Sequence, residues 1–225
     1  MSLEADHPDD DFTARARIRD AALTTFAARG FDGATIREIA RRAKVSSGLV
    51  RHHFGSKEDL RAACDDFALA RIIEIKERAV GGGEVADVGF LSATHPTVLL
   101  LYRYFARSLV DGSQAAAELF QRMVELCESW LDRFHEGEFD DPRAFSAYLI
   151  AMEVGALTLQ DELSRALGAD VRSRDGHLRL TRARIDFYSH PLLSQEIAAQ
   201  ARAAISAFAT PGGGAFAPDQ QSSVL

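Results

Sequence analysis

Cysteine, tryptophan and long apolar runs are scarce in this chain of 225 residues. Its two cysteines, Cys64 and Cys127, are far apart in the sequence, which is neither a disulfide framework nor the spacing of metal ligands. The apolar runs, such as Val98 to Leu101, are far shorter than the roughly 20 residues that span a bilayer. The N-terminus is acidic, whereas a signal peptide begins with a basic and then an apolar stretch. These absences predict a cytoplasmic protein without a membrane partner.

Charge is distributed unevenly along the chain. The formal net charge is -7, yet the segment from Phe12 to Leu60 contains ten basic and five acidic residues and so carries +5. The rest of the chain must therefore carry -12. A basic module can neutralise DNA phosphates, while an acidic body is repelled by the duplex. The pattern favours a nucleic-acid-binding segment attached to a larger acidic domain.

Apolar residues recur at three- and four-residue spacing in nearly every long segment, and the alternating runs typical of strands are absent. We therefore predict an all-α fold. The first helix should cover about residues 13–29 and end at Gly30, which suits a helix C-terminus. A capping box formed by Thr35 and Glu38 should open the second helix, and Ser46 should cap the third. Ser56 then precedes a fourth helix.

Three consecutive glycines, Gly81 to Gly83, are the strongest break inside the chain, because glycine disfavours a helix and offers no side chain for packing. Further helices are predicted beyond it, with Pro96 and Pro142 in first turns. Their ranges are 85–92, 96–111, 114–135, 142–167 and 193–209. Residues 169–190 remain unassigned.

Two short helices joined by a tight turn are typical of a helix-turn-helix, whose second helix enters the DNA major groove. The relevant segments are Thr35-Ile36-Arg37-Glu38-Ile39-Ala40, Ala43-Lys44-Val45-Ser46-Ser47-Gly48 and His53-Phe54-Gly55-Ser56-Lys57-Glu58-Asp59-Leu60, preceded by Phe26-Ala27-Ala28-Arg29-Gly30-Phe31. In order and spacing they resemble the N-terminal signature of the TetR family over about residues 13–64. The resemblance implies a ligand-responsive transcriptional regulator without a cofactor. In its simplest form this is a repressor that binds a palindromic operator as a homodimer and is released by a small molecule.

With this resemblance, the chain divides into four segments. Residues 12–60 form an N-terminal three-helix DNA-binding domain, and residues 61–210 form a larger helical domain for effector binding and dimerisation. Residues 1–11 and 211–225 are polar or acidic and are predicted to be disordered tails.

Candidate DNA-contacting residues follow from matching the family signature position by position. They are Thr35, Arg37, Lys44, Ser46, Ser47, Gly48, Leu49, Arg51, His52, His53 and Lys57. Thr35 and Lys57 are at helix N-termini, which suit a phosphate. The small residues Ser46 to Gly48 allow a close approach to base edges, and Arg51 and His52 are the expected specificity residues.

Three positions depart from the family pattern. Arg51 replaces the usual tyrosine and so substitutes a charge for an aromatic contact. Lys44 replaces a frequent glycine, which predicts strain if its φ angle is positive. Leu49 replaces a polar residue and either meets a thymine methyl or packs against Val45.

The C-terminal domain offers candidates for an apolar effector pocket. They are Tyr102, Phe105, Phe120, Met123, Cys127, Trp130, Phe134 and Met152. The same stripe at helical spacing is also typical of an ordinary core. Glu153 is the charged candidate, because a carboxylate in so apolar a helix must meet either a ligand or an arginine such as Arg103 or Arg107.

A dimer interface is expected because helix-turn-helix proteins commonly bind two half-sites about 34 Å apart. The helix from Phe145 to Leu159 is apolar on all sides except for Glu153, so it must be covered on more than one side. The resemblance implies that the helices near 142–167 and 193–209 form the interface. The last helix presents Ile197, Ala201 and Ile205 on one face.

Two alternatives remain at this point: an all-helical enzyme, or an interaction module with an incidental basic hairpin. An enzyme would need a nucleophile with its base, paired carboxylates or a metal constellation, and the sequence shows none of these. Adjacent His52 and His53 point in different directions on a helix and cannot chelate one metal together. The arginines between Arg172 and Arg184 form either a solvated face, which we prefer, or a site for an anionic effector.

Overall fold

A computed structural model describes residues 8–209 of the chain, apart from residues 136 and 138. The described residues are helical and contain no strand, which confirms the all-α prediction. They fall into two compact units, divided after Gln160. The predicted tail 211–225 and residues 1–7 of the predicted N-terminal tail lie outside the described residues. Among the described residues, no helix is both long enough and apolar enough to cross a membrane.

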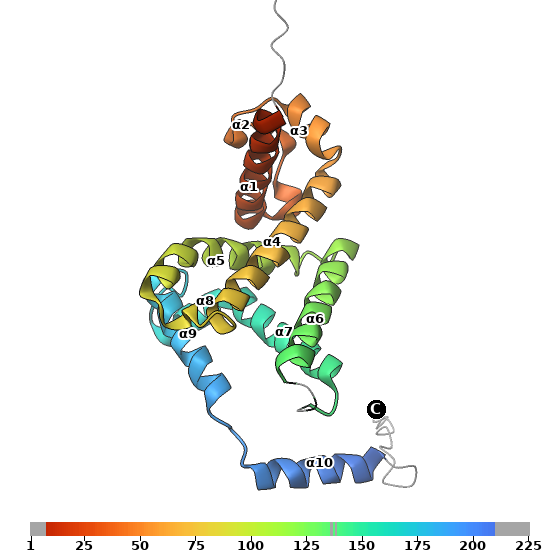
Figure 1. The fold of residues 1–225 in the computed structure, drawn as a ribbon, viewed down its shortest axis with the longest axis vertical. Helices are drawn as coiled ribbons and strands as arrows, with labels where there is room; N and C mark the ends of the chain where they lie inside the picture. Colours follow the sequence, from red (N-terminus) through yellow and green to blue (C-terminus); the bar gives the residue numbers. More distant parts are fainter. Residues whose placement is uncertain (1–7, 136, 138, 210–225) are drawn as a thin grey trace, which may run out of the picture. The chain divides into compact units, whose positions relative to one another are not determined.

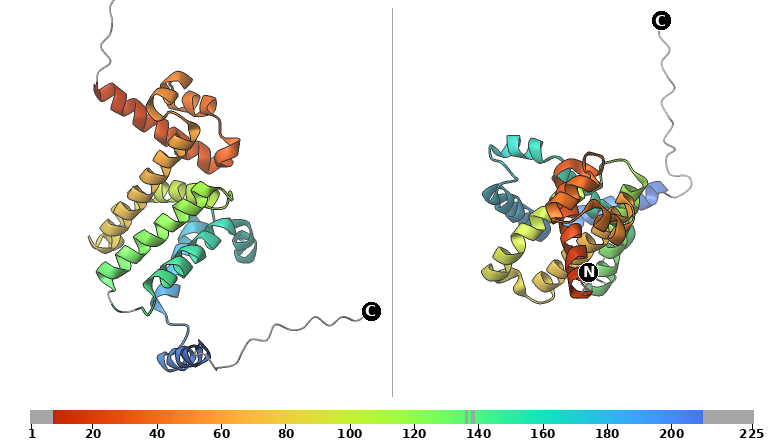
Figure 2. Two further views of the ribbon diagram at one scale, coloured as in Figure 1. Left: turned by 90° about the vertical axis from the view of Figure 1, so that its right-hand side faces the viewer. Right: turned by 90° about the horizontal axis from the view of Figure 1, so that it is seen from above.

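The first unit contains a helix-turn-helix followed by longer helices (Figure 1). Its elements are α1 (Pro8–Gly33), α2 (Ile36–Ala43), α3 (Ser47–Phe54), α4 (Lys57–Val80), η1 (Glu84–Ala86), α5 (Val88–Ser108), α6 (Gln114–Phe134) and α7 (Pro142–Thr158). The rest of the described chain forms α8 (Gln160–Leu167), which begins at the division, α9 (Arg174–Ser189) and α10 (Gln195–Ala209). Figure 2 shows the same ribbon from two further directions.

Local sequence accounts well for the first helices. Ile18, Ala22 and Phe26 are buried along one face of α1, as the three- and four-residue spacing predicted. Gly30 interrupts the helix with φ 71° and ψ 176°, which confirms the predicted break. Glycine adopts this positive φ without the steric cost of a side chain.

One core serves the helix-turn-helix and the helices that follow it. A single hydrophobic cluster takes buried residues from each of α1, α2, α3, α4, α5 and α6, and its members include Phe26, Val50, Leu60, Tyr104 and Leu119. Helix α1 packs along α5, and α4 contacts α1, α3, α5 and α6. Within this unit the helix-turn-helix is therefore not an isolated module.

The prediction of two separate helices at 85–92 and 96–111 was wrong. Residues 88–108 form one helix, α5, and Pro96 lies inside it rather than in its first turn. Proline lacks the N–H that would bond to the carbonyl four residues earlier, here Ser92. Both Ser92 and Pro96 are exposed, so water can hydrogen-bond that carbonyl and the cost of the proline is reduced.

The predicted helix at 142–167 is two helices, α7 and α8. Thr158 Oγ1 donates to the carbonyl of Gly155 (3.0 Å), a local bond that competes with continued helix formation. Leu159 follows with φ -92° and ψ 29° and ends α7. Pro142 occupies the first turn of α7, as predicted. The unassigned stretch 169–190 contains α9, which is capped by Ser173.

Candidate nucleic-acid interface

Side-chain caps position the two helices of the helix-turn-helix. Thr35 Oγ1 accepts a hydrogen bond from Glu38 N (3.2 Å), and Ser46 Oγ accepts one from Leu49 N (3.0 Å), as predicted. The other half of the predicted capping box was wrong. The Glu38 carboxylate pairs with Arg29 Nη2 (3.1 Å) instead of the Thr35 amide, because an oppositely charged partner binds a carboxylate more strongly than a neutral amide does.

Lys44 forms the turn between α2 and α3 in a left-handed conformation, with φ 58° and ψ 44°. It is the only residue other than glycine with a positive φ among those the structure describes, so the condition under which strain was predicted is met. Val45 N donates to Ala40 O (3.0 Å), which satisfies a carbonyl at the end of α2. The side chain of Lys44 is exposed, so its charge is available to a phosphate.

We expect Lys44→Gly to raise the free energy of unfolding by about 1 kcal/mol, because glycine adopts the left-handed conformation without steric cost. Binding to DNA should weaken in the same variant, since an exposed positive charge that can attract phosphates is lost. Lys44→Ala is the matched control: it removes the charge but keeps the strained backbone. Urea denaturation and DNA titration measure the two effects. A glycine variant no more stable than the alanine variant would contradict the assignment of strain.

Helix α3 has a buried side and an exposed side. Val50 and Phe54 are buried, whereas Gly48, Arg51 and His52 are exposed. Ser46 is exposed, and Ser47 and Leu49 are half-buried at the start of the helix. Because its buried side anchors α3 to the core, the exposed side presents small residues first and then Arg51 and His52, which can hydrogen-bond.

The end of α3 is held by α1. His53 is half-buried, and its carbonyl accepts a hydrogen bond from Arg15 Nη1 (3.0 Å). The Arg15 guanidinium also lies 4.7 Å from the centre of the Phe54 ring. These contacts fix the C-terminal end of α3, and they place His53 nearer the protein than Arg51 or His52.

A true capping box opens α4, which the sequence reasoning missed. Ser56 Oγ accepts from Asp59 N (2.9 Å), and Asp59 Oδ2 accepts from Ser56 N (3.1 Å). These bonds lower the pKa of Asp59, the side-chain bond to Ser56 most of all. A serine followed three residues later by a carboxylate was the signal that could have revealed it. Lys57, next to the cap, is half-buried with its ammonium 4.2 Å from the centre of the Phe31 ring.

An open groove borders α3 on the side of α1 and α4. Its volume is about 510 Å³, and it is lined by Arg15, Ala16, Arg19, Phe54, Ala63, Asp66 and Phe67. The Arg19 guanidinium lies 3.5 Å from the centre of the Phe67 ring. Arg15 and Arg19 belong to the basic segment predicted from the sequence, but their place in a groove was not predicted.

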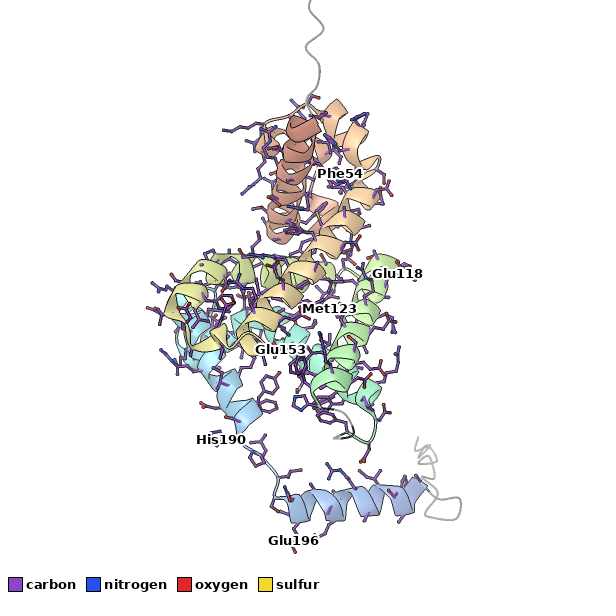
Figure 3. The ribbon with its side chains drawn as sticks, in the orientation of Figure 1. Phe54, Glu118, Met123, Glu153, His190 and Glu196 are labelled. Atoms are coloured by element: carbon purple, nitrogen blue, oxygen red, sulfur yellow. The ribbon has the colours of Figure 1, made fainter. Side chains whose placement is uncertain are left out.

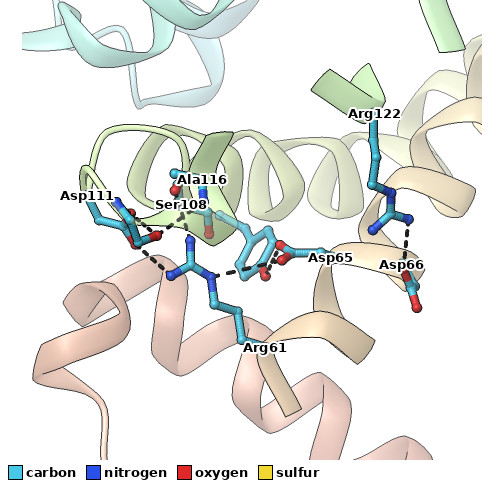
Figure 4. Close-up of polar contacts among 9 residues, drawn as sticks. Arg61, Asp65, Asp66, Ser108, Asp111, Ala116 and Arg122 are labelled. Atoms are coloured by element: carbon cyan, nitrogen blue, oxygen red, sulfur yellow. Dashed lines mark hydrogen bonds and ion pairs between the residues drawn. The ribbon is translucent and has the colours of Figure 1, made fainter. Parts of the chain in front are cut away.

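A polar cluster, buried except at Asp111, joins α4 to the end of α5 and the connection that follows it (Figure 4). This group, hereafter the Arg61 cluster, consists of Arg61, Asp65, Tyr104, Ser108 and Asp111. Arg61 Nη1 lies 2.7 Å from Asp111 Oδ2, and Arg61 Nη2 donates to Ser108 O (3.1 Å). Tyr104 donates its phenolic hydrogen to Asp65 Oδ1 (2.6 Å).

Ionisation in the Arg61 cluster is perturbed by burial. Burial raises the pKa of Asp65 to about 6, although the Tyr104 hydrogen bond and the Arg61 charge act in the opposite direction. Burial also raises the pKa of Tyr104, and the neighbouring Asp65 charge adds to that rise. The sequence reasoning missed this cluster, because an arginine and an aspartate four residues apart look like an ordinary surface pair on a helix.

The effector-pocket candidates lie on α5, α6 and α7, and α7 packs against both α5 and α6. Phe105 is fully buried in the shared core, which fits an ordinary packing role. Tyr102, Phe120, Met123, Cys127, Trp130, Met152 and Glu153 are half-buried, and Phe134 is exposed. Trp130 and Phe134 contact each other, with ring centres 5.0 Å apart. Met123 and Glu153 come from the two helices that pack together, α6 and α7 (Figure 3).

Two models of known families match this chain. The model for bacterial regulatory proteins of the tetR family matches residues 18–64, and the model for tetracyclin repressor-like C-terminal domains matches residues 98–194. The HTH-type transcriptional regulatory protein RaaS of Mycobacterium tuberculosis (strain ATCC 25618 / H37Rv) is 39% identical over 153 residues, which cover 66% of this chain and 72% of RaaS. The chain belongs to the TetR family. As a TetR-family member it is a transcriptional regulator and not an enzyme, which removes both alternatives left open by the sequence.

Other relatives agree with TetR-family membership. The HTH-type transcriptional repressor Rv3405c of the same organism is 31% identical over 177 residues, covering 74% of this chain and 83% of that protein. A solved structure presented as "Molecular basis for control of antibiotic production by a bacterial hormones" is 26% identical, with a TM-score of 0.53, and covers 77% of this chain and 95% of its own. A putative TetR-family regulator from Rhodococcus sp. shares the fold at 20% identity and a TM-score of 0.52, covering 66% and 87%.

Proposed function

We propose that this TetR-family regulator binds a palindromic operator as a homodimer and represses transcription until a small molecule in its C-terminal domain releases it. The observation that carries the proposal is the exposed side of α3, where Gly48, Arg51 and His52 face outward from a well-anchored helix. Its place of action would be the bacterial cytoplasm, where the operator lies. The division into residues 12–60 for DNA and 61–210 for effector and dimer belongs to the same proposal, although α4 runs across residue 60.

In this proposal the candidate residues divide the work of DNA recognition. Arg51 and His52 contact base edges in the major groove, and Ser46, Ser47 and Gly48 allow the helix to come close. Leu49 contacts a thymine methyl or the protein beside it. The remaining candidates contact the phosphate backbone and set the register: Thr35, Arg37, Lys44, His53 and Lys57.

The proposed dimer uses apolar faces that the structure leaves exposed. On α7, Phe145 and Tyr148 are 38% and 68% exposed, and on α10, Ile197 and Ile205 are 54% and 68% exposed. Helix α10 contains no buried residue, so its apolar side chains gain burial from a partner copy. Sedimentation at micromolar concentration should therefore give twice the mass of one chain, and a monomer would argue against the dimer.

The proposed effector is a largely apolar small molecule. The half-buried aromatic, sulfur and carboxylate side chains of α5, α6 and α7 supply an apolar lining with few polar groups, the usual composition of such sites. One structural relative is described as concerned with control of antibiotic production by a bacterial hormone, and that relative is the reason to test small diffusible signals first.

Selection of bound sequences from random DNA tests the proposed function. The selected sequences should contain two inverted half-sites about one helical turn apart, because a two-fold dimer presents two recognition helices. Binding should weaken steeply as salt increases, since phosphate contacts release counterions. A single asymmetric site would contradict the dimer, and failure to enrich any sequence would contradict operator binding.

Arg51→Ala is expected to lower affinity for the selected operator roughly 5- to 150-fold and to relax the sequence preference at one base pair, because a bidentate contact to guanine contributes about 1–3 kcal/mol. Lys57→Ala should instead weaken binding to all sequences alike and reduce the slope of affinity against salt. Titration of both variants with operator and unrelated duplexes separates the two roles. Equal losses on both duplexes for Arg51→Ala would show that it contacts phosphate and not a base.

A further inference from the structure

Hydrogen bonds connect the Arg61 cluster to the start of α6 without interruption. Asp111 Oδ2 pairs with Arg61, while Asp111 Oδ1 accepts from Ser113 N (2.9 Å) and from Ser113 Oγ (2.6 Å). Ser113 is the N-cap of α6, and its Oγ accepts from Ala116 N (3.1 Å). Ala116 and Leu119 are buried, so the first turn of α6 is firmly packed. A displacement of this turn therefore acts directly on Arg61 and on α4.

Arg61 also has a second carboxylate within reach. Its side chain is 5% exposed, and its Nε atom has no hydrogen-bond partner among the described residues. Asp65 Oδ2 lies 3.9 Å from that Nε atom, which is too long for a hydrogen bond. A buried donor without an acceptor is costly, and a small rotation toward Asp65 would satisfy it. If Arg61 moved away from Asp111, the Asp65 carboxylate would therefore still compensate its buried charge.

We propose that Arg61 is a two-position latch between the DNA-binding segment and α6. Paired with Asp111, it fixes α4 to the start of α6, as in the structure. Paired with Asp65 on its own helix, it leaves α4 free of that connection. The inference rests on the proposed function, and it makes Arg61 a positioning residue that carries a shift of α6 to the recognition helix. Helix α6 bears Met123, Cys127 and Trp130, which are effector-pocket candidates.

A second ion pair, which joins α4 directly to α6, provides a matched control. Arg122 Nη2 of α6 lies 2.7 Å from Asp66 Oδ1 of α4, the same separation as in the Arg61–Asp111 pair (Figure 4). Its side chains are 43% and 66% exposed, whereas Arg61 and Asp111 are 5% and 20% exposed. Solvent screens the Arg122–Asp66 pair, and its exposed side chains can move, so this pair should transmit little of a displacement of α6 to α4.

Operator DNA is the probe that tests the latch, since coupling between two sites is reciprocal and needs no known effector. Amide hydrogen exchange of the peptide over residues 113–119 is measured in the full chain, with the selected operator duplex and with an unrelated duplex of equal length. In the wild type, the operator should slow exchange in this peptide by about threefold or more. In Asp111→Asn the operator should still bind, within about threefold of the wild-type affinity, but the change in exchange should vanish.

Two further variants serve as a control and as a substitute for Asp111→Asn. Asp66→Asn, which breaks the exposed pair, should retain the wild-type change in exchange. If circular dichroism shows that Asp111→Asn does not fold, Ser113→Ala cuts the same path without altering a charge and should show the same loss. The latch is refuted if operator binds the wild type without changing exchange, or if the folded path variants keep the change. Binding of neither duplex to the wild type would overturn the proposed function, and the latch with it.

Discussion

Arg61→Ala is expected to lower the free energy of unfolding by roughly 3–5 kcal/mol, the usual loss when one partner of a buried ion pair is removed. The substitution leaves two carboxylates facing the vacated site, Asp65 and Asp111. It also leaves the Ser108 carbonyl without the donor seen in the structure. Urea denaturation followed by far-UV circular dichroism measures the loss. The slope of free energy against denaturant should stay unchanged if the folded state remains compact.

The control for this prediction is Arg122→Ala, which removes the exposed partner of Asp66. Its free energy of unfolding should stay within about 1 kcal/mol of the wild type, because exposed ion pairs contribute little. Each variant deletes an arginine whose guanidinium lies 2.7 Å from an aspartate carboxylate, Asp111 for Arg61 and Asp66 for Arg122. The two ion pairs differ in burial. Equal losses in the two variants would mean that burial does not set the strength of the Arg61 cluster.

Asp65→Asn is expected to make the protein more stable than the wild type at neutral pH by up to about 3 kcal/mol, the free energy of a pKa shift of about two units. The pKa of Asp65 is raised from the ordinary 3.8 to about 6 in the folded protein. At a pH between 3.8 and about 6, the Asp65 carboxyl group is protonated in the folded state and ionised in the unfolded state. The stability contributed by this proton is therefore complete below pH 3.8 and is lost as pH rises through 6. Asparagine keeps an oxygen acceptor for Tyr104 but cannot ionise.

Denaturation of both proteins at pH 4, 5, 6 and 7 tests the sign of this effect. The advantage of Asp65→Asn over the wild type should be small at pH 4 and should grow up to pH 7. Asp111, whose pKa is lowered by its bonds to Ser113 and Arg61 in spite of partial burial, is present in both proteins, so its contribution largely cancels. Asp66→Asn is the exposed counterpart and should show no such growth. A difference that is constant with pH would contradict the raised pKa of Asp65.

Local signals made the helix-turn-helix predictable. Thr35 and Ser46 cap helices through contacts within three residues, and Gly30 breaks α1 through its own backbone. Such interactions depend on neighbours in sequence, so the residue types alone indicate them. Lys44 stands where the family pattern often has glycine, which made strain the expectation for a positive φ, and the structure gives it one.

Features that depend on distant segments were missed or misassigned. Pro96 was placed in a first turn, but whether a helix tolerates proline in its interior depends on solvent at Ser92. Arg61 is buried by the end of α5 and the connection that follows, which lie almost fifty residues further along the chain. The aromatic stripe of α5 and α6 predicted burial, and Phe105 is indeed in the core. Helical spacing alone does not tell a pocket wall from a packed interior.

Helix α4 is uninterrupted, and side-chain contacts hold both of its ends. Its first residue follows the Ser56 cap beside the recognition helix, and near its last turn Glu77 pairs with Arg133 of α6 and Arg78 pairs with Glu84. With 24 residues it is roughly 36 Å long, so a tilt of about 5° around its far end moves the first turn by about 3 Å. That displacement is as long as a hydrogen bond to a base. The length of α4 therefore means that, if α3 binds DNA as proposed, a tilt of a few degrees would be enough to move α3 out of register with it.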